Sequence, residues 1–333
     1  HYTPNAGVPE LRRAVADKLA RENRLAVDPD REVMVTAGAC EAVCVAALGL
    51  LEPGDEAIVL TPAWTSYAAA AELAGARPVE VPTRPEDGFL PDPDRLRAAI
   101  TSRTRLLFLC SPNNPTGAVY PESLLREIGR IAEEAEIAVI SDEIYERIVY
   151  DDERQVSFAT LPGMRSRTLT VNGVGKAFSM TGWRVGYLVG PEETIRALLR
   201  VHQNLVASAC AFAQWGAVEA LDHPEGCVEE MVAEYARRRA ALCDGLARTN
   251  RIDLVRPRGT FYAFPRLADG DGDAEAVSFK LLREAHVAAV PGGVFGAGFE
   301  RHLRVSYCSS LEDVAEGARR IAAVLEGHAA LSG

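Results

Sequence analysis

Strand patterns and helix patterns alternate along the first two-thirds of the chain, and this alternation most constrains its fold. Amphipathic patterns typical of helices lie between short apolar runs typical of buried strands. The runs fall at 33–35, 57–60, 79–81, 106–110, 138–140, 168–171 and 185–189. Strands joined by helical crossovers form parallel sheets with both faces covered. We therefore predict an α/β fold with a mostly parallel sheet sandwiched by helices.

A break in this alternation predicts a second domain. Two long helical stretches, 191–221 and 225–248, interrupt it, and strand and helix patterns resume after Gly259. We predict a large domain over 1–245 and a smaller C-terminal α+β domain over 246–333. The chain opens on His1 and runs almost at once into a helical pattern. We therefore expect the N-terminal part of the small domain to be missing.

Charge and cysteine content narrow the class of protein. The net charge of −11 disfavours nucleic acid and anionic membrane as partners, because both attract basic patches. The longest apolar run, Ala42 to Leu51, is too short to span a bilayer. The seven cysteines are odd in number and never spaced C-x-x-C, so neither a disulfide framework nor a zinc site fits. We predict a cytoplasmic protein without a metal.

Four predicted strands end in small or polar residues that the fold alone does not require. Ligands of open α/β sheets bind beyond the carboxyl ends of the strands. Each strand end also has a simpler interpretation as helix packing, a turn, a helix cap or a surface lysine. One shared ligand accounts for all four strand ends, whereas the simpler interpretations would have to hold independently at each of the four. The residues are Gly38, Ala39 and Cys40, then Asn114, then Asp142 and Tyr145, and then Lys176.

These residue types suit an aromatic, phosphorylated ligand that carries an aldehyde. A helix start built from small residues offers amides to a phosphate, and Arg184 adds a guanidinium. The amine of Lys176 can form a Schiff base with a carbonyl, and Asp142 can keep a pyridine nitrogen protonated. Asn114 and Tyr145 can both hydrogen-bond a ring hydroxyl. Pyridoxal phosphate (PLP) has all of these groups.

The stretch GVGKAFSMTGWRVG, residues 173–186, resembles the lysine-attachment motif of a known enzyme family. The family is the fold-type I PLP-dependent aminotransferases of class I/II, and the closest likeness is to its bacterial aspartate aminotransferase-like subgroup. Further motifs follow the family's order and spacing, so the resemblance covers nearly the whole chain. They are LEPGDEAIVLTPAWTSY, SPNNPTG, SDEIYE, VPGGVFG and LRVSY.

The resemblance implies roles for the residues around the cofactor. It implies that Lys176 is the Schiff-base lysine and proton shuttle, and that Asp142 contacts the pyridine nitrogen. Tyr145 and Asn114 would contact the ring oxygen, and Arg184 the phosphate. The residues implied to bind the cofactor are Tyr2, Gly38, Ala39, Cys40, Trp64, Asn114, Asp142, Tyr145, Lys176 and Arg184, and those implied to be catalytic are Lys176, Asp142 and Tyr145.

The resemblance also implies how substrate and partner subunit are bound. Arg304 would clamp the substrate α-carboxylate, with Asn114 and Trp64 beside the substrate. Trp64 would stack on the cofactor ring; its simpler interpretation is a core tryptophan. Tyr2 would reach the phosphate of a neighbouring subunit, which predicts a homodimer with shared active sites.

The function implied is transfer of an amino group from an α-amino acid to a 2-oxo acid by a ping-pong mechanism. Another PLP reaction, such as that of a β-lyase, decarboxylase or oxidase, is an alternative, and a PLP-sensing regulatory domain is a distant one. Three departures from the family pattern stand out. Gly173 replaces a serine, and Cys40 stands where the acidic-substrate members carry a lysine. Residues 203–210 are more apolar than their Ser/Thr-rich counterpart. The last two departures predict a neutral or apolar donor rather than an acidic one.

Overall fold

A seven-stranded sheet forms the centre of the computed structural model, which describes residues 2–224, 226–268, 270 and 273–328. Its order is β1-β7-β6-β5-β4-β2-β3, and neighbours among β2 to β6 are parallel, whereas β7 is antiparallel to both β6 and β1. The strands are β1 (Val33–Thr36), β2 (Glu56–Thr61), β3 (Arg77–Pro82), β4 (Thr104–Cys110), β5 (Ala138–Asp142), β6 (Thr168–Gly173) and β7 (Gly186–Val189). The predicted mostly parallel sheet is confirmed.

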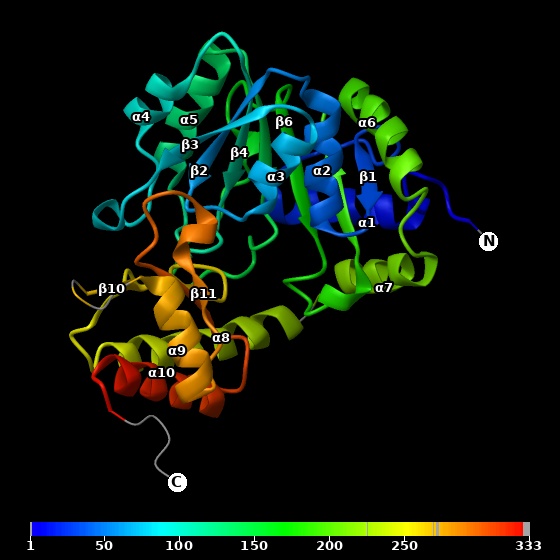
Figure 1. The fold of residues 1–333 in the computed structure, drawn as a ribbon. Coiled ribbons are helices and arrows are strands. Elements are labelled where there is room, and N and C mark those ends of the chain that lie inside the picture. Colours follow the sequence, from blue (N-terminus) through cyan, green and yellow to red (C-terminus); the bar gives the residue numbers. More distant parts are fainter. Residues whose placement is uncertain (1, 225, 269, 271–272, 329–333) are drawn as a thin grey trace.

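Helices cover both faces of this sheet (Figure 1). The alternation of side chains along a strand explains the two buried faces: in β2, Val59 packs toward α2 and α3, whereas Ile58 packs toward α4 and α5. The helices of this part are α1 (Pro9–Lys18), α2 (Ala39–Leu50), α3 (Ser66–Leu73), α4 (Pro93–Ala99), α5 (Glu122–Glu134), α6 (Glu192–Leu205) and α7 (Ala211–Asp222).

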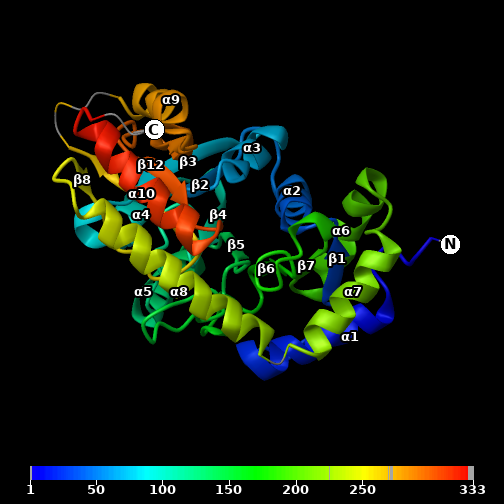
Figure 2. The ribbon, with the colours of Figure 1, turned by 90° about the horizontal axis from the view of Figure 1, so that it is seen from below.

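The long helical stretch predicted at 191–221 consists of two separate helices in the structure. Helix α6 ends at Leu205, and α7 begins at Ala211. Between them Ala207 has φ +64°, a left-handed conformation that cannot continue a right-handed helix. The chain therefore turns at this residue, and α6 and α7 are two separate helices (Figure 2).

A smaller C-terminal part combines helices with short strands around its own apolar core. Helix α8 lies alongside α10 across one face of the molecule (Figure 2), and its buried Leu242 and Leu246 belong to this core. The elements are α8 (Cys227–Leu246), β8 (Ile252–Asp253), β9 (Tyr262–Ala263), β10 (Arg266–Leu267), α9 (Ala274–Ala285), β11 (Val290–Pro291), β12 (Leu303–Ser306) and α10 (Leu311–Leu325). The predicted smaller α+β part is confirmed.

The boundary between residues 245 and 246 stays a prediction. Helix α8 joins the two parts, and residue 225, the predicted start of this helix, lies outside the described residues, as do 329–333. Tyr145, which follows β5, also packs into the C-terminal core. The sheet ends and the C-terminal part are therefore in direct contact beside the predicted site.

Candidate active site

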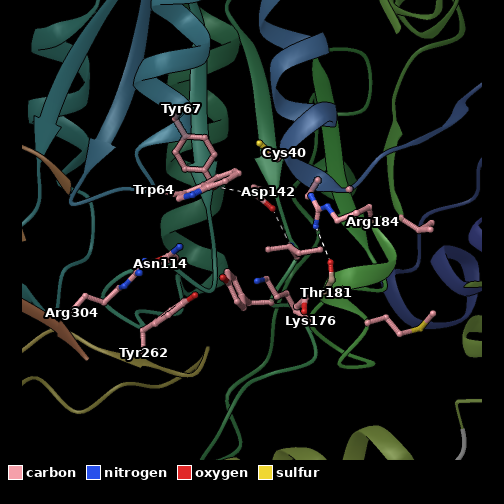
Figure 3. Close-up of a pocket in the computed structure, with 17 residues that line it drawn as sticks. Cys40, Trp64, Tyr67, Asn114, Asp142, Lys176, Thr181, Arg184, Tyr262 and Arg304 are labelled. Carbon is pink, nitrogen blue, oxygen red and sulfur yellow. Dashed lines mark hydrogen bonds between the residues drawn. The ribbon is translucent and has the colours of Figure 1, made fainter. Parts of the chain in front are cut away.

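A pocket of about 270 Å³ lies where the parallel strands end and β9 and β12 approach them. Of the predicted site residues, all except Tyr2 line it: Gly38, Ala39, Cys40, Trp64, Asn114, Asp142, Tyr145, Lys176, Arg184 and Arg304. Figure 3 shows Arg304 and Asn114 on one side of Asp142 and Arg184 on the other, with Lys176 between the two arginines. The four strand ends predicted to share a ligand thus meet at one pocket.

One end of the pocket is suited to an anion. Gly38 precedes α2 with φ +86°, and the first amides of the helix have no acceptor within it. A Cβ on Gly38 would lie 2.5 Å from Nη2 of Arg184, so the guanidinium approaches because the residue is glycine. Arg184 donates through Nη1 to the Thr181 carbonyl at 3.0 Å, and it has no carboxylate partner in the described part of the chain. Helix dipole and guanidinium together attract a phosphate.

Asp142 ends β5 and is 2% exposed. Its Oδ2 accepts a hydrogen bond from the Tyr67 hydroxyl at 2.7 Å, and its Oδ1 accepts one from the Ile144 amide at 3.2 Å. Burial raises the pKa of Asp142 to about 6, against the hydrogen bonds and the charge of Lys176, which lower it. A buried carboxylate on the pocket wall suits a protonated ring nitrogen.

Lys176 lies half-buried, with Nζ 5.5 Å from the ring centroid of Phe261 and 5.8 Å from that of Tyr145. Within the described residues its Nζ has no hydrogen bond or ion pair. Burial lowers the pKa of Lys176, and the charges of Arg184 and Arg304 act in the same direction, whereas Cys308 and Asp142 oppose the shift. A lower pKa leaves more of the amine neutral, which is the form that attacks a carbonyl and accepts a proton.

The other end of the pocket holds Arg304. Its Nη1 donates to Oδ1 of Asn114 at 3.1 Å, and no carboxylate pairs with it among the described residues. Its guanidinium carbon lies 4.5 Å from the ring centroid of Tyr262 and 4.9 Å from that of Phe295. An arginine held in this way, without an acidic partner, can bind a carboxylate through a forked contact.

Cys40 places a thiol on the pocket wall in the first turn of α2. A hydrogen bond from Cys44 and the nearby charge of Arg184 lower the pKa of Cys40 to about 6, although burial opposes them. Unlike a lysine at this position, the cysteine side chain is short and cannot carry a positive charge.

Sequence reasoning missed seven residues on the pocket wall: Tyr67, Ile144, Gly175, Met180, Thr181, Val185 and Tyr262. Tyr67 could have been found, because it follows Trp64 by three residues at the start of a helical pattern. Tyr262 comes from the two-residue strand β9, for which the sequence contains no such spacing. Tyr2 lies outside the pocket of its own chain and is 94% exposed, so its role toward a neighbouring subunit stays a prediction.

Residues 1–321 match the family described as aminotransferase class I and II. The chain belongs to this family. It is 42% identical to an aspartate aminotransferase of Pyrococcus abyssi, over 98% of this chain and 84% of that protein. It is 45% identical to an aspartate/prephenate aminotransferase of Thermus thermophilus, over 97% and 83% of the two chains. A solved aromatic aminotransferase of Pyrococcus horikoshii superposes with a TM-score of 0.96 at 41% identity, over 99% and 89%.

This aminotransferase is a PLP-dependent enzyme, and its pocket fits the cofactor. The fit rests on three features of the pocket wall: a cation beside a helix start, a buried carboxylate, and a lysine amine without a partner among the described residues. They match the phosphate, the ring nitrogen and the aldehyde of PLP in chemistry.

Within residues 2–328, apart from the gaps named above, no helix is both long enough and apolar enough to cross a membrane. Over the same residues, no three His, Cys, Asp or Glu side chains gather as a metal site would require.

Proposed function

We propose that this aminotransferase moves an amino group from an α-amino acid to a 2-oxo acid in two successive half-reactions, and that it prefers a neutral or apolar donor to an acidic one. One observation carries the proposal. A single pocket holds a partly buried lysine between two arginines, and in the described residues none of the three has a carboxylate partner. Such a pocket can hold two anionic groups, the phosphate of the cofactor and the carboxylate of the substrate, on either side of one reactive amine.

Each residue of the pocket acts on a different group of the cofactor or of the substrate. When bound, PLP supplies an aldehyde that takes up amino groups and a ring that accepts the electron pair released at Cα. Arg304 and Asn114 hold the substrate α-carboxylate, and Asp142 holds the proton on the ring nitrogen. Lys176 removes the proton from the substrate Cα, and burial favours the neutral amine that this step needs because it lowers the pKa of the lysine. Trp64 covers the ring and excludes water.

The donor preference rests on which cations line the pocket. The basic side chains on its wall are Lys176, Arg184 and Arg304, and each has a role in the proposal above. Cys40 offers no positive charge to a second carboxylate. A carboxylate buried without a cation is disfavoured by several kcal/mol or must be protonated. The names of the relatives do not decide the question, because they include aspartate and aromatic amino acids.

A donor panel tests both parts of the proposal. Purified enzyme is given aspartate, alanine, leucine and phenylalanine with several 2-oxo acids, and both products are quantified. We expect equal amounts of new 2-oxo acid and aminated acceptor, parallel double-reciprocal plots, and the highest kcat/KM with a neutral donor. Carbon dioxide, ammonia or peroxide without aminated acceptor would instead indicate another PLP reaction.

Two variants at one position test the donor preference directly. Cys40→Lys should raise kcat/KM for aspartate relative to phenylalanine, whereas Cys40→Met, of similar length but uncharged, should not. A wild-type kcat/KM for aspartate above that of every neutral donor would show that the inference from Cys40 is wrong.

A further inference from the structure

Tyr262 lines the pocket beside Arg304, and its ring also contacts the ring of Tyr145. It begins β9, which pairs antiparallel with β12, the strand that carries Arg304. Its side chain is half-buried and lines the pocket (Figure 3).

The first contact is with Arg304. The guanidinium carbon lies 4.5 Å from the centroid of the Tyr262 ring, and Asn114 accepts from Nη1 of the same guanidinium at 3.1 Å. A cation over an aromatic face is attracted by the ring and restricted in orientation by it. Phe295 adds a second ring at 4.9 Å from the same carbon. The direction in which Arg304 presents its remaining N–H groups is therefore set by its aromatic neighbours.

The second contact is with Tyr145. The two rings meet edge to face, with centroids 6.1 Å apart and an interplanar angle of 78°. Tyr145 is 4% exposed, so its ring has little room to move. The contact with Tyr262 therefore restricts the ring whose hydroxyl is proposed to serve the cofactor ring.

The backbone before Tyr262 is itself held by buried tyrosines. Thr260 is fully buried with φ +61°, a conformation that costs a β-branched residue energy. The Thr260 carbonyl accepts hydrogen bonds from the hydroxyls of Tyr150 at 2.5 Å and Tyr307 at 3.1 Å, and its Oγ1 accepts from the Tyr262 amide at 3.1 Å. Three hydrogen bonds thus fix the turn from which Tyr262 projects.

We propose that Tyr262 is a positioning residue whose ring orients the guanidinium of Arg304 on one side and the ring of Tyr145 on the other. This inference rests on the roles proposed above for Arg304 and Tyr145. One side chain then keeps the carboxylate end and the cofactor end of the site in a fixed relation. The two contacts have separable effects, because KM reports on Arg304 and the absorbance of the bound cofactor reports on Tyr145.

Two variants separate these effects. Tyr262→Phe keeps the ring, so KM for amino-acid donors should stay within about twofold of the wild type. The contact of its ring with Tyr145 is also kept, so the pH midpoint of the bound cofactor's absorbance should stay at the wild-type value. Tyr262→Leu removes the ring and should raise KM by about tenfold, with a smaller change in kcat. It also frees the ring of Tyr145, which then orients its hydroxyl less well, so the absorbance midpoint should rise by about half to one pH unit.

Phe295→Leu is the matched control. It removes the other ring beside Arg304 but leaves the contact between Tyr262 and Tyr145, so KM should rise while the absorbance midpoint stays at the wild-type value. Circular dichroism of each purified variant checks that it is folded. If Tyr262→Leu does not fold, Phe295→Leu still decides whether the aromatic neighbours of Arg304 set KM.

The outcomes distinguish this inference from the proposed function. A wild-type midpoint in Tyr262→Leu would overturn the link to Tyr145, and a wild-type KM in the same variant would overturn the link to Arg304. Both would leave transamination by the wild-type enzyme intact. A wild-type enzyme that transaminates no donor would overturn the proposed function, whereas the absorbance midpoints would still report on Tyr262 and Tyr145.

Discussion

The hydroxyl of Tyr67 donates a hydrogen bond of 2.7 Å to Oδ2 of Asp142, and both side chains are almost completely buried. Tyr67 lies in the first turn of α3, and Asp142 ends β5, so two crossover units of the sheet meet at this contact. The hydrogen bond stabilises the ionised carboxylate, whereas burial destabilises it and raises the pKa of Asp142 to about 6. The balance places the titration of Asp142 close to neutral pH.

This titration predicts a pH dependence of cofactor binding. Above pH 6 Asp142 is ionised and can pair with a protonated ring nitrogen; below pH 6 it is neutral and cannot. The affinity of the apoenzyme for PLP should therefore fall as the pH falls, by about tenfold from pH 7 to pH 5. Fluorescence titration of the apoenzyme measures it. Asp142→Asn should bind weakly at every pH, and an unchanged pH profile in this variant would assign the titration to another group.

Lys176 should be the lysine that carries the cofactor. The chain has three lysines, Lys18, Lys176 and Lys280. Borohydride reduction followed by peptide mapping can therefore assign the label to one of only three side chains. We expect the label on Lys176 and complete loss of turnover in Lys176→Ala. Lys280→Ala, on α9, should keep wild-type activity. A label on Lys18 or Lys280 would contradict the assignment.

Arg304 should be needed for every amino-acid donor, because all donors share the α-carboxylate. A hydrogen bond to a charged group contributes about 1.5–3 kcal/mol, so Arg304→Ala should lose at least about tenfold in kcat/KM with each donor. Steady-state kinetics over the donor panel measures this loss. Arg319→Ala, on the surface of α10, is the control and should match the wild type. A loss confined to one donor would mean that Arg304 contacts a side chain instead.

The enzyme should be a homodimer joined through its N-terminal segment, α6 and α7, which lie on the same side of the molecule in both views (Figures 1 and 2). Large apolar side chains are exposed there, as expected of a surface that becomes buried. They are Tyr2, Trp183, Leu205, Val206, Phe212 and Trp215. Sedimentation at micromolar concentration should show a dimer.

Phe212→Asp tests which surface forms the dimer. Phe212 is 75% exposed, and a charge at this position should shift the protein toward monomer and lower its activity. Phe279→Asp, at an exposed position on α9, is the control and should remain dimeric. An active wild-type monomer would contradict the prediction of shared active sites.

The order of the sheet's elements and most of the site could be predicted from the sequence because they depend on local patterns. Strand and helix periods are properties of short segments, and the carboxyl ends of parallel strands meet at one edge. Asn114, Asp142 and Lys176 each follow a predicted strand directly, so placing the strands was enough to bring them together. The break between α6 and α7 was not predicted, because it depends on the left-handed backbone of Ala207 in an otherwise helical pattern.

Only the tertiary structure decided which side chains support these residues. Tyr67 reaches Asp142 across 75 positions of sequence, and Tyr262 reaches Arg304 and Tyr145 from a strand of two residues. Such contacts depend on how the C-terminal part packs against the sheet, and no local period specifies that packing. The pKa values of Asp142 and Lys176 follow the same rule: the sequence contains the ionisable groups, whereas burial, which only the folded chain creates, shifts their pKa.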